Sequence, residues 1–434
     1  MWHYFRDDAV SPTETEKKTG SSVLPQALSG VRVLDLTGDS SQYCGKMFAQ
    51  LGAEVLLIEP PAGSRSRYEG PFLGNQPHKE RSLAFAYFNQ GKRGMCLDLS
   101  RDEAQKIVRQ LAAQTDLVIE AESPGSLQSY GLDFASLQKE NGGLIMASIT
   151  PFGQTGPYAQ FRGGDMIALA LGGLLYLGGY PKHAPIAAYG NQALLAAAQF
   201  AAVASMMAVW EAEGQTGEKT GQHIDVSVHE SVVMALENSI QFVELEKTIR
   251  QRNGGEQRQA GTGVFPCKDG MIYLMAGGIA SNRFWGATTQ WLIDAGAPDA
   301  EQLRAECWND QRYLATDDAK RIFSGIFLPF AKNQTKAELY EEGQQRRIPI
   351  CPVSTPSDLM TNRQLAYRKY FQPTSHTFTN QPLTVPGAPY GLSATPWRLG
   401  RPAPMLGEHT SEILTSLGYD MKAQEVCLRE GVTA

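Results

Sequence analysis

The sequence lacks the short motifs that mark common cofactor and metal sites. None of its cysteines form a CxxC pair, there is no HExxH motif, and His223 and His229 lie six residues apart, which does not place them on one helix face. The turn after the first predicted strand holds one glycine, Gly38, so the GxGxxG fingerprint of dinucleotide binding is absent, as is a P-loop. We therefore predict no protein-bound metal and no dinucleotide cofactor.

The chain also lacks an excess of positive charge. It carries 39 Lys and Arg against 45 Asp and Glu, a formal net charge of -6, which argues against nucleic acid or an anionic membrane as the main partner. Scattered cysteines in a chain of 434 residues favour free thiols in a reducing compartment, the cytoplasm. These cysteines are Cys44, Cys96, Cys267, Cys307, Cys351 and Cys427.

Long apolar runs are scarce. The start of the chain carries four acidic residues before any apolar run, so residues 1–27 are predicted to be a loosely ordered extension and not a signal peptide. The most apolar stretch, Ala193 to Trp210, is rich in alanine and contains Gln199 and Ser205. A membrane span needs about 20 strongly apolar residues. We predict a buried helix that packs closely through its alanines.

The first half of the chain alternates short apolar strands with helical segments. Val31 to Leu36 and Gly52 to Glu59 read as strands, with a helix between them from about Gln42 to Leu51. Further strands are predicted at Gly94–Leu99, Leu117–Ile119 and Leu144–Ile149, and a helix at Arg101–Gln114. This pattern predicts an α/β fold with a doubly wound parallel sheet. Ligands of such sheets bind beyond the carboxyl ends of the strands, which points to Ser40, Ser41 and the loops after Glu59 and Ile149.

The second half has a different pattern. His223–Ser227 reads as a short strand, and Val264–Ala276 as a hairpin that turns at Lys268-Asp269-Gly270. Residues 349–404 are dense in proline and glycine, which disfavours long helices. We predict that residues 28–222 form the first part of a large α/β domain and that residues 223–340 form a smaller α+β domain. A return segment at 341–434 is predicted to complete the large domain.

Several strings resemble family III CoA-transferases, the group that includes formyl-CoA transferase, carnitine CoA-transferase and α-methylacyl-CoA racemase. They occur in the family's order from residue 28 to about residue 418, and together they are specific where each alone is weak. The strings are Leu28-Ser29-Gly30-Val31-Arg32-Val33-Leu34-Asp35-Leu36, Phe88-Asn89-Gln90-Gly91-Lys92-Arg93, Ala147-Ser148-Ile149-Thr150-Pro151-Phe152-Gly153-Gln154-Thr155-Gly156-Pro157-Tyr158, Gly221-Gln222-His223-Ile224-Asp225-Val226-Ser227 and Arg401-Pro402-Ala403-Pro404-Met405-Leu406-Gly407-Glu408-His409-Thr410.

The resemblance implies an interlocked dimer of two-domain subunits, which would explain the proline-rich crossing segment. It also implies coenzyme A as a ligand. CoA phosphates require positive charge and N–H donors. The residues predicted to bind CoA are Ser40, Ser41, Arg65, Arg67, Asn89, Lys92 and Arg93.

The sequence departs from the family where the nucleophile is expected. Transferases of this family attack the donor thioester with an aspartate, which forms a mixed anhydride and releases CoA thiolate. Counting back from Thr216-Gly217 reaches Leu194 or Leu195, and a short gap instead aligns Gly190-Asn191 with the family's Gly-Asp. Either alignment leaves the position without a carboxylate. Asp165 lies about 29 residues earlier and is interpreted as a helix N-cap. The racemase histidine is missing too, since Gly163-Gly164-Asp165 stands where that branch has Gly-His-Asp.

Three interpretations follow. In the first, the chain is the non-nucleophilic subunit of a CoA-transferase and pairs with a catalytic paralogue, as in the two-subunit benzylsuccinate CoA-transferases, exchanging CoA between an acyl-CoA and a free aromatic or dicarboxylic acid. In the second, it is a self-sufficient homodimer that uses a carboxylate elsewhere in its sequence. In the third, it is a non-catalytic acyl-CoA-binding protein.

Apolar side chains around the alanine-rich stretch line either the core or an acyl site, and we favour the core. These side chains are Tyr189, Phe200, Met206, Met207 and Trp210.

Overall fold

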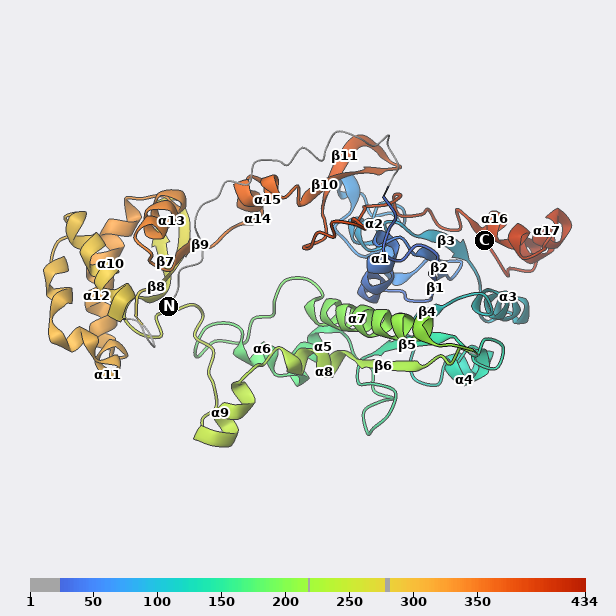
Figure 1. Cartoon of the computed structure of the whole chain (residues 1–434), viewed down its shortest axis with the longest axis horizontal. Coiled ribbons are helices and arrows are strands. Elements are labelled where there is room, and N and C mark those ends of the chain that lie inside the picture. The colour runs from blue at the N-terminus through green and yellow to red at the C-terminus, as the bar shows by residue number, and fades with distance from the viewer. Residues whose placement is uncertain (1–23, 218, 278–281) are drawn as a thin grey trace.

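The computed structural model describes residues 24–217, 219–277 and 282–434. Most of the predicted N-terminal extension, residues 1–23, and Gly278 of the glycine pair after the predicted hairpin lie outside the described residues. The described chain forms a large unit that contains the C-terminus and a smaller unit apart from it, joined by two separate stretches of chain (Figure 1).

The large unit is built on a six-stranded parallel sheet with the order β3-β2-β1-β4-β5-β6. The chain starts at β1 in the middle of the sheet, adds β2 and β3 on one side, and then adds β4, β5 and β6 on the other side of β1. This reversal of strand order confirms the predicted doubly wound α/β fold. Its strands are β1 (Arg32–Asp35), β2 (Glu54–Glu59), β3 (Arg93–Cys96), β4 (Leu117–Glu120), β5 (Ile145–Thr150) and β6 (His223–Ser227).

Both faces of the sheet are covered by helices, because alternate strand residues point to opposite sides. Val33, Val55 and Ile119 belong to one core cluster with α1 and α7, whereas Leu34 and Val118 belong to a second cluster on the other side. The helices of this unit are α1 (Tyr43–Gln50), α2 (Leu83–Phe88), α3 (Asp102–Ala112), α4 (Phe134–Leu137), α5 (Asp165–Leu171), α6 (Leu174–Leu177), α7 (Gln192–Gly214) and α8 (Val228–Met234).

Helix α7 has two unlike faces. Most of its alanines are buried in the core beside the sheet, among them the fully buried Ala197 and Ala201, which confirms the predicted close packing through small side chains. The opposite face is exposed, so the expectation that the large side chains there belong to the core is wrong for Phe200, Met207 and Trp210, with Trp210 exposed to 78%. Within the described residues, α7 alone is long and apolar enough to cross a membrane by length and composition.

The smaller unit has its own core. Strands β7 (Thr262–Cys267), β8 (Gly270–Met275) and β9 (Ile350–Pro352) form an antiparallel sheet, and β7 and β8 are the predicted hairpin. Aromatic side chains such as Trp291 and Phe323 fill the space between this sheet and its helices. These helices are α10 (Asn282–Asp294), α11 (Gln311–Leu314), α12 (Asp317–Lys332) and α13 (Lys336–Gln345).

The observed units differ from the predicted boundaries at residues 222 and 340. Strand β6 is the edge strand of the large sheet because its backbone pairs with β5, so the large unit continues past residue 222 through α8. Strand β9 pairs with β8, so the small unit extends to Pro352. Helix α9 (Ser239–Glu246) lies on the first connection between the units (Figure 1).

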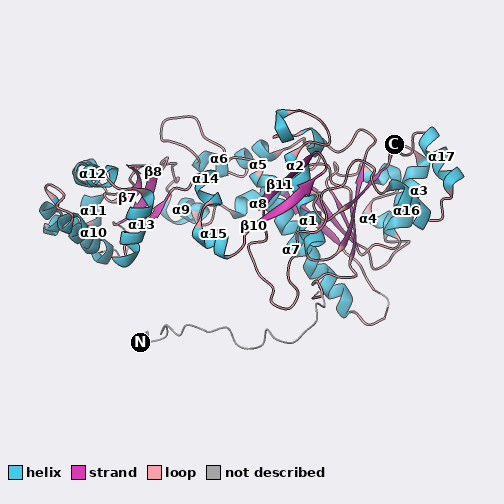
Figure 2. Cartoon of the chain, turned by 90° about the horizontal axis from the view of Figure 1, so that it is seen from above, coloured by secondary structure: helices cyan, strands magenta, loops and turns pink. Residues whose placement is uncertain are grey.

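The second connection is the proline-rich return segment. It forms the short helices α14 (Pro356–Met360) and α15 (Arg363–Tyr367) and the hairpin β10 (Phe371–His376)–β11 (Thr379–Pro386), with no long helix. Helices α16 (Thr410–Ser416) and α17 (Met421–Arg429) then pack on the large sheet, where Ile413 and Cys427 join the core of the α3 face. Figure 2 shows these last two helices beside α3.

Candidate functional site

The largest hollow of the large unit lies where the strands end, and we call it the main pocket. It has a volume of about 750 Å³ and opens at the carboxyl ends of β1, β2, β4 and β5, next to the start of α7. The loops predicted from the strand pattern meet here. The walls are formed by Asp39, Ser41, Arg65, Glu69, residues 121–124, Ile149, Pro151, residues 159–166, Ala187, Ala188, Gly190, Asn191, Leu194 and Val228.

Of the three positions that could align with the family's nucleophile, Asn191 and Leu194 line the main pocket and Leu195 does not. Asn191 directly precedes α7, and its Nδ2 donates a hydrogen bond of 2.7 Å to Oγ of the buried Ser40. Leu194 lies one turn into α7 and also packs against the core of the sheet. Neither side chain carries a carboxylate, and the amide of Asn191 is fixed toward Ser40. The pocket therefore has no acid at the position where the family places one.

A carboxylate does approach the same helix end from another element. Asp165 begins α5, and its Oδ1 accepts hydrogen bonds from the backbone N–H of Ala193 at 2.7 Å and of Leu194 at 3.2 Å. Burial raises the pKa of Asp165, and these two N–H donors oppose the shift. Asp165 is thus a cap, as predicted, but it caps α7 while Gly164 occupies the N-cap of α5. Two of the free N–H groups at the start of α7, which could attract an anion, are thus already occupied by this side chain.

Acidic side chains outnumber basic ones around the main pocket. Asp39, Glu69, Glu122 and Asp165 line it, against Arg65 and Arg162. The Arg65 Nε atom lies 3.3 Å from Oε1 of Glu69, so part of its charge is already neutralised. Burial, with the neighbouring Asp39 carboxylate, raises the pKa of Glu122. The pocket offers little net positive charge to the phosphates of CoA.

Lys92 and Asn89 lie beneath this site and not in it. Lys92 is fully buried, and its Nζ donates to Oδ2 of Asp35 at 2.7 Å, to the Gln42 carbonyl at 2.7 Å and to Oδ1 of Asn89 at 2.8 Å. Asn89 Nδ2 in turn donates to Oε1 of Gln42 at 2.9 Å. All three donors of the ammonium are therefore used within the protein. The network fixes the turn that carries Ser40 and Ser41.

Arg67 is likewise buried in ion pairs. Its Nε and Nη2 atoms each lie 2.8 Å from the Glu59 carboxylate, and its Nη1 lies 2.6 Å from Oε2 of Glu80. Nη2 also donates to the carbonyl of Pro404 at 3.0 Å, which ties the return segment to this loop. The guanidinium is fully buried, and Arg65, two residues earlier, is the arginine of this loop that reaches the main pocket.

Arg93 lies elsewhere. It begins β3, so its side chain projects at the amino-terminal edge of the sheet, where it lines a separate cavity with Arg32 and pairs with Glu412 at 2.8 Å. The structure thus brings Ser41 and Arg65 together in the main pocket, places Ser40, Asn89, Lys92 and Arg67 in the supporting layer, and separates Arg93 from both.

Sequence reasoning missed four charged residues of the pocket wall: Asp39, Glu69, Glu122 and Arg162. Glu122 follows β4 directly, so the rule that ligands bind beyond carboxyl strand ends could have found it. Arg162 lies in a glycine-rich loop after β5 and has no ion-pair partner among the described residues. The sequence around Arg162 contains no pattern that predicts a place in the pocket wall, because the position of its side chain depends on how the loop folds.

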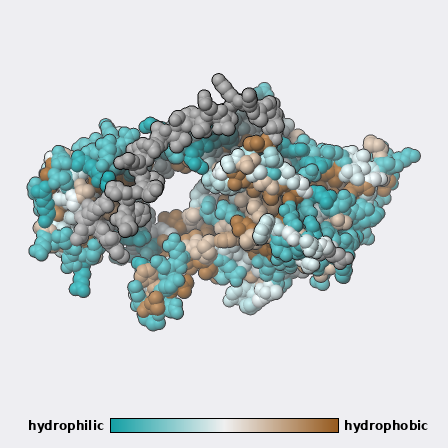
Figure 3. All heavy atoms as spheres, viewed as in Figure 1, coloured by the Kyte–Doolittle hydropathy of each residue, from teal (hydrophilic) through white to brown (hydrophobic). Residues whose placement is uncertain are grey.

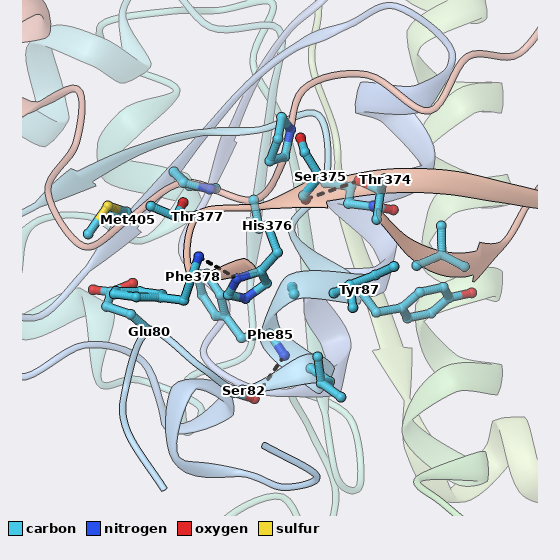
Figure 4. A pocket seen from close by; sticks show the side chains of 18 of the residues that line it. Glu80, Ser82, Phe85, Tyr87, Thr374, Ser375, His376, Thr377, Phe378 and Met405 are labelled. Carbon is cyan, nitrogen blue, oxygen red and sulfur yellow. Dashed lines mark hydrogen bonds between the residues drawn. The ribbon is translucent and has the colours of Figure 1, made fainter. Parts of the chain in front are cut away.

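A second cavity of about 270 Å³ lies between α2 and the β10–β11 hairpin (Figure 4). None of the residues predicted to bind CoA line it. Nδ1 of His376 accepts a hydrogen bond from the backbone N–H of Phe378, and Ser82 Oγ accepts one from the N–H of Phe85. Within the described part of the chain, no group of three or more potential ligands is placed to hold a metal ion.

The buried Lys92 network gives a first prediction. Lys92→Met leaves the Asp35 carboxylate buried without its cation, which should lower the free energy of unfolding by about 3–5 kcal/mol. The matched control is Arg93→Met, which breaks the partly exposed pair with Glu412 and should cost about 1 kcal/mol or less. Urea unfolding monitored by fluorescence measures both. Equal stability of the two variants would contradict the assignment of Lys92 to the supporting layer.

The buried carboxylate of Glu120 titrates near neutral pH. Glu120 ends β4 at 4% exposure, accepts a hydrogen bond of 2.7 Å from the N–H of Glu122 and is hydrogen-bonded to Ser148. Burial is the main cause that raises the pKa of Glu120 to about 7, with Glu122 and Asp225 adding to the shift. The folded chain therefore holds this proton at pH values where the unfolded chain has released it.

The sign of the pH effect follows directly. Stability from protonated Glu120 is fully present below the unfolded pKa, about 4.3, and is lost as the pH rises toward 7. Glu120→Gln should match the unmodified chain at pH 4.5 and exceed its free energy of unfolding by roughly 2–3 kcal/mol at pH 8. Chemical denaturation across this range measures the difference, with the exposed Glu140→Gln as control. A Glu120→Gln variant whose advantage does not change with pH would contradict the shift.

Comparisons with known proteins show which family the chain resembles. The model of CoA-transferase family III matches residues 28–410. The chain is 39% identical over 407 residues, 94% of its length and 98% of the other, to succinyl-CoA:(R)-benzylsuccinate CoA-transferase subunit BbsE of Thauera aromatica. It is 30% identical, over 94% of its length and 92% of the other, to the succinyl-CoA–L-malate CoA-transferase alpha subunit of Chloroflexus aurantiacus.

Solved structures show the same fold. A CAIB/BAIF family protein from Brucella suis superposes with a TM-score of 0.75 at 26% identity, over 91% of this chain and all of that one. The family model and the superposition both cover nearly the whole chain. The chain belongs to CoA-transferase family III.

Proposed function

We propose that this chain is the non-nucleophilic subunit of a two-subunit CoA-transferase. The complex exchanges CoA between an acyl-CoA thioester and a free carboxylic acid, and a homologous catalytic subunit supplies the reactive aspartate. The observation that carries the proposal is Asn191, which lines the main pocket at the start of α7 with its amide bonded to Ser40. We further propose that the complex acts in the cytoplasm, without membrane or nucleic acid.

The chemistry of the exchange explains why one amide decides the role of the subunit. The attacking carboxylate forms a mixed anhydride with the acyl group and frees CoA thiolate. The thiolate then attacks the enzyme carbonyl of the anhydride, which releases the donor's acid as a carboxylate and leaves an enzyme-bound CoA thioester. This thioester is close in energy to the substrate thioester, so the exchange runs in both directions. An amide nitrogen has its lone pair delocalised into the carbonyl and is a poor nucleophile. Asn191 can therefore position a ligand but cannot accept CoA.

The charges of the pocket support the same role. Of the residues predicted to bind CoA, Ser41 and Arg65 line the main pocket, and we add Arg162 to this set. Two arginines among four carboxylates give weak attraction for the phosphates. We propose that the strong CoA site lies mainly on the catalytic subunit, and that Ser41, Arg65 and Arg162 contribute part of it.

The exposed face of α7 supports a partner subunit. Phe200, Val203, Met207 and Trp210 recur at helical spacing and are exposed to between 40% and 78%. An exposed apolar stripe of this kind is typical of a protein–protein interface. The two separate connections between the units (Figure 1) also fit an interlocked dimer, in which a second chain passes between them. We propose that the homologous subunit covers this stripe.

Relatives indicate the substrates. The names of two similar proteins contain succinyl-CoA as the donor, with (R)-benzylsuccinate or L-malate as the acceptor. Both names describe a subunit of a transferase. We propose succinyl-CoA as donor and an aromatic or dicarboxylic acid as acceptor for the complex that contains this chain.

A second function is favoured by Asp165. Its carboxylate lies in the main pocket, and its Oδ1 is within 2.7 Å of the N–H of Ala193. A self-sufficient enzyme would use this residue as its nucleophile. Against this, one carboxylate oxygen is held by two N–H donors, which lowers its basicity.

Restoring the carboxylate tests the role of position 191. Asn191→Asp places an acid beside the Ser40 hydroxyl, so succinyl-CoA followed by hydroxylamine should add a hydroxamate to the chain, detected by intact mass, while the unmodified chain gains none. Leu194→Asp is the matched control and should stay unlabelled, because that side chain packs against the core. Labelling of the unmodified chain that disappears in Asp165→Asn would establish the self-sufficient enzyme instead.

Disrupting the stripe tests the partner surface. Met207→Asp puts a charge in the centre of the stripe and should weaken assembly with the co-expressed homologous subunit at least tenfold, since burying an unpaired charge is costly. Leu428→Asp is the control, a leucine of α17 that is 60% exposed away from α7. Analytical ultracentrifugation measures the association. Unchanged assembly of Met207→Asp would place the interface elsewhere.

A further inference from the structure

A chamber lined by leucines adjoins the main pocket. It has a volume of about 500 Å³, and its walls are Leu169, Leu174, Leu175 and Leu177 with Tyr180 and Ile186. Charged side chains are absent from the residues that line it. Figure 3 shows apolar side chains gathered over α5 and α6, the helices that form this wall. We call this hollow the leucine chamber.

The chamber and the main pocket share two wall residues, Ala187 and Ala188. Both lie within four residues of Asn191, so the two hollows meet close to the position of the family's nucleophile. A side chain larger than that of alanine at either position would fill space between them. A ligand whose carbonyl carbon lies near Asn191 can therefore extend past these alanines.

The fold builds the chamber with specific contacts. The backbone N–H of Ile186 donates to the Gly178 carbonyl at 3.1 Å, and a Cβ on Gly178 would lie 2.3 Å from the Ile186 carbonyl oxygen. Glycine is thus required where the wall folds back on itself. The shape is fixed by close backbone packing and not by loose contact of side chains.

Arg252 fastens the same wall from the first connection between the units. Its guanidinium donates to three backbone carbonyls, those of Tyr176 at 3.1 Å, Tyr180 at 3.1 Å and His183 at 2.6 Å. Tyr176 also donates from its hydroxyl to Oε1 of Gln251 at 2.9 Å. The loop is therefore held in place before any ligand arrives, which lowers the entropic cost of binding.

We propose that the leucine chamber binds the apolar part of the acyl group, a hydrocarbon of about the size of a phenyl ring, while the carbonyl carbon lies near Asn191. This inference rests on the proposed function, and it adds a substrate class. A carboxylate in the chamber would face apolar side chains with no basic residue among those that line it, which is unfavourable. Charged ends of the acyl group stay in the main pocket, where Arg65 and Arg162 lie.

A pair of thioesters that differ only in the ring tests the chamber. Binding of 3-phenylpropionyl-CoA and of propionyl-CoA to the full chain is measured by calorimetry. Burial of the ring should give the phenyl compound about tenfold or higher affinity. Ala188→Trp fills the space where the two hollows meet and Leu177→Asp charges the chamber, and either should remove this preference. Leu177 lines the chamber and not the main pocket, so Leu177→Asp should bind propionyl-CoA as before. Tyr189→Ala is the control, since Tyr189 is 94% exposed and lines neither hollow.

The outcomes separate this inference from the proposed function. Equal affinity for the two thioesters would overturn the chamber and leave the subunit role intact. A preference that survives in both variants would place the ring elsewhere and overturn it too. Failure of the chain to bind either thioester would also overturn it, whereas labelling of Asn191→Asp and assembly with the partner test the subunit role independently.

Discussion

The buried Lys92 ammonium holds together the part of the structure on which the site depends. It joins the end of β1 at Asp35, the turn at Gln42 and the segment before β3 at Asn89, and no donor is left for a ligand. Breaking it would release the turn that carries Ser40, whose hydroxyl holds Asn191. The floor of the main pocket is thus a fixed polar layer, built from residues that sequence motifs assign to CoA.

The start of α7 contacts this polar layer through Asn191, which stands at the position of the family's nucleophile. The N-terminus of a helix attracts negative charge. In this chain Asp165 already occupies two of the N–H groups there, and Asn191 presents an amide. The site has the shape of a reaction pocket, and its own carboxylates surround rather than occupy the family's nucleophilic position. This arrangement supports our proposal that the chain keeps the acyl end of a substrate in place while a partner supplies the reactive acid.

Much of the fold was predictable from the sequence because it depends on local patterns. The strands from Val31 to Ile149 are short apolar runs that end in turns, and their alternation with helices determined the doubly wound sheet. The strand at His223 was found, but its assignment to the small domain did not match, because backbone pairing with β5 across 75 residues leaves no local signal. Periodicity likewise could not show which face of α7 is exposed.

The location of the site could be predicted from the sequence better than the contacts that its side chains make. The rule of carboxyl strand ends located the main pocket, with Ser41 and Arg65 in its wall. The same motifs could not show that Arg67 and Lys92 turn inward to Glu59 and Asp35, because a buried ion pair is set by tertiary packing. The leucine chamber was not predicted either, since its wall forms only where the chain folds back and the N–H of Ile186 bonds to the Gly178 carbonyl.

The most direct test measures CoA exchange between succinyl-CoA and a free acid, first with the purified chain and then with its homologous subunit. We predict no exchange by the chain alone, no acyl-enzyme trapped on it by hydroxylamine, and full activity when an aspartate-bearing partner is added. Robust exchange by the chain alone would contradict the account, because it would mean that a carboxylate of this same polypeptide accepts CoA.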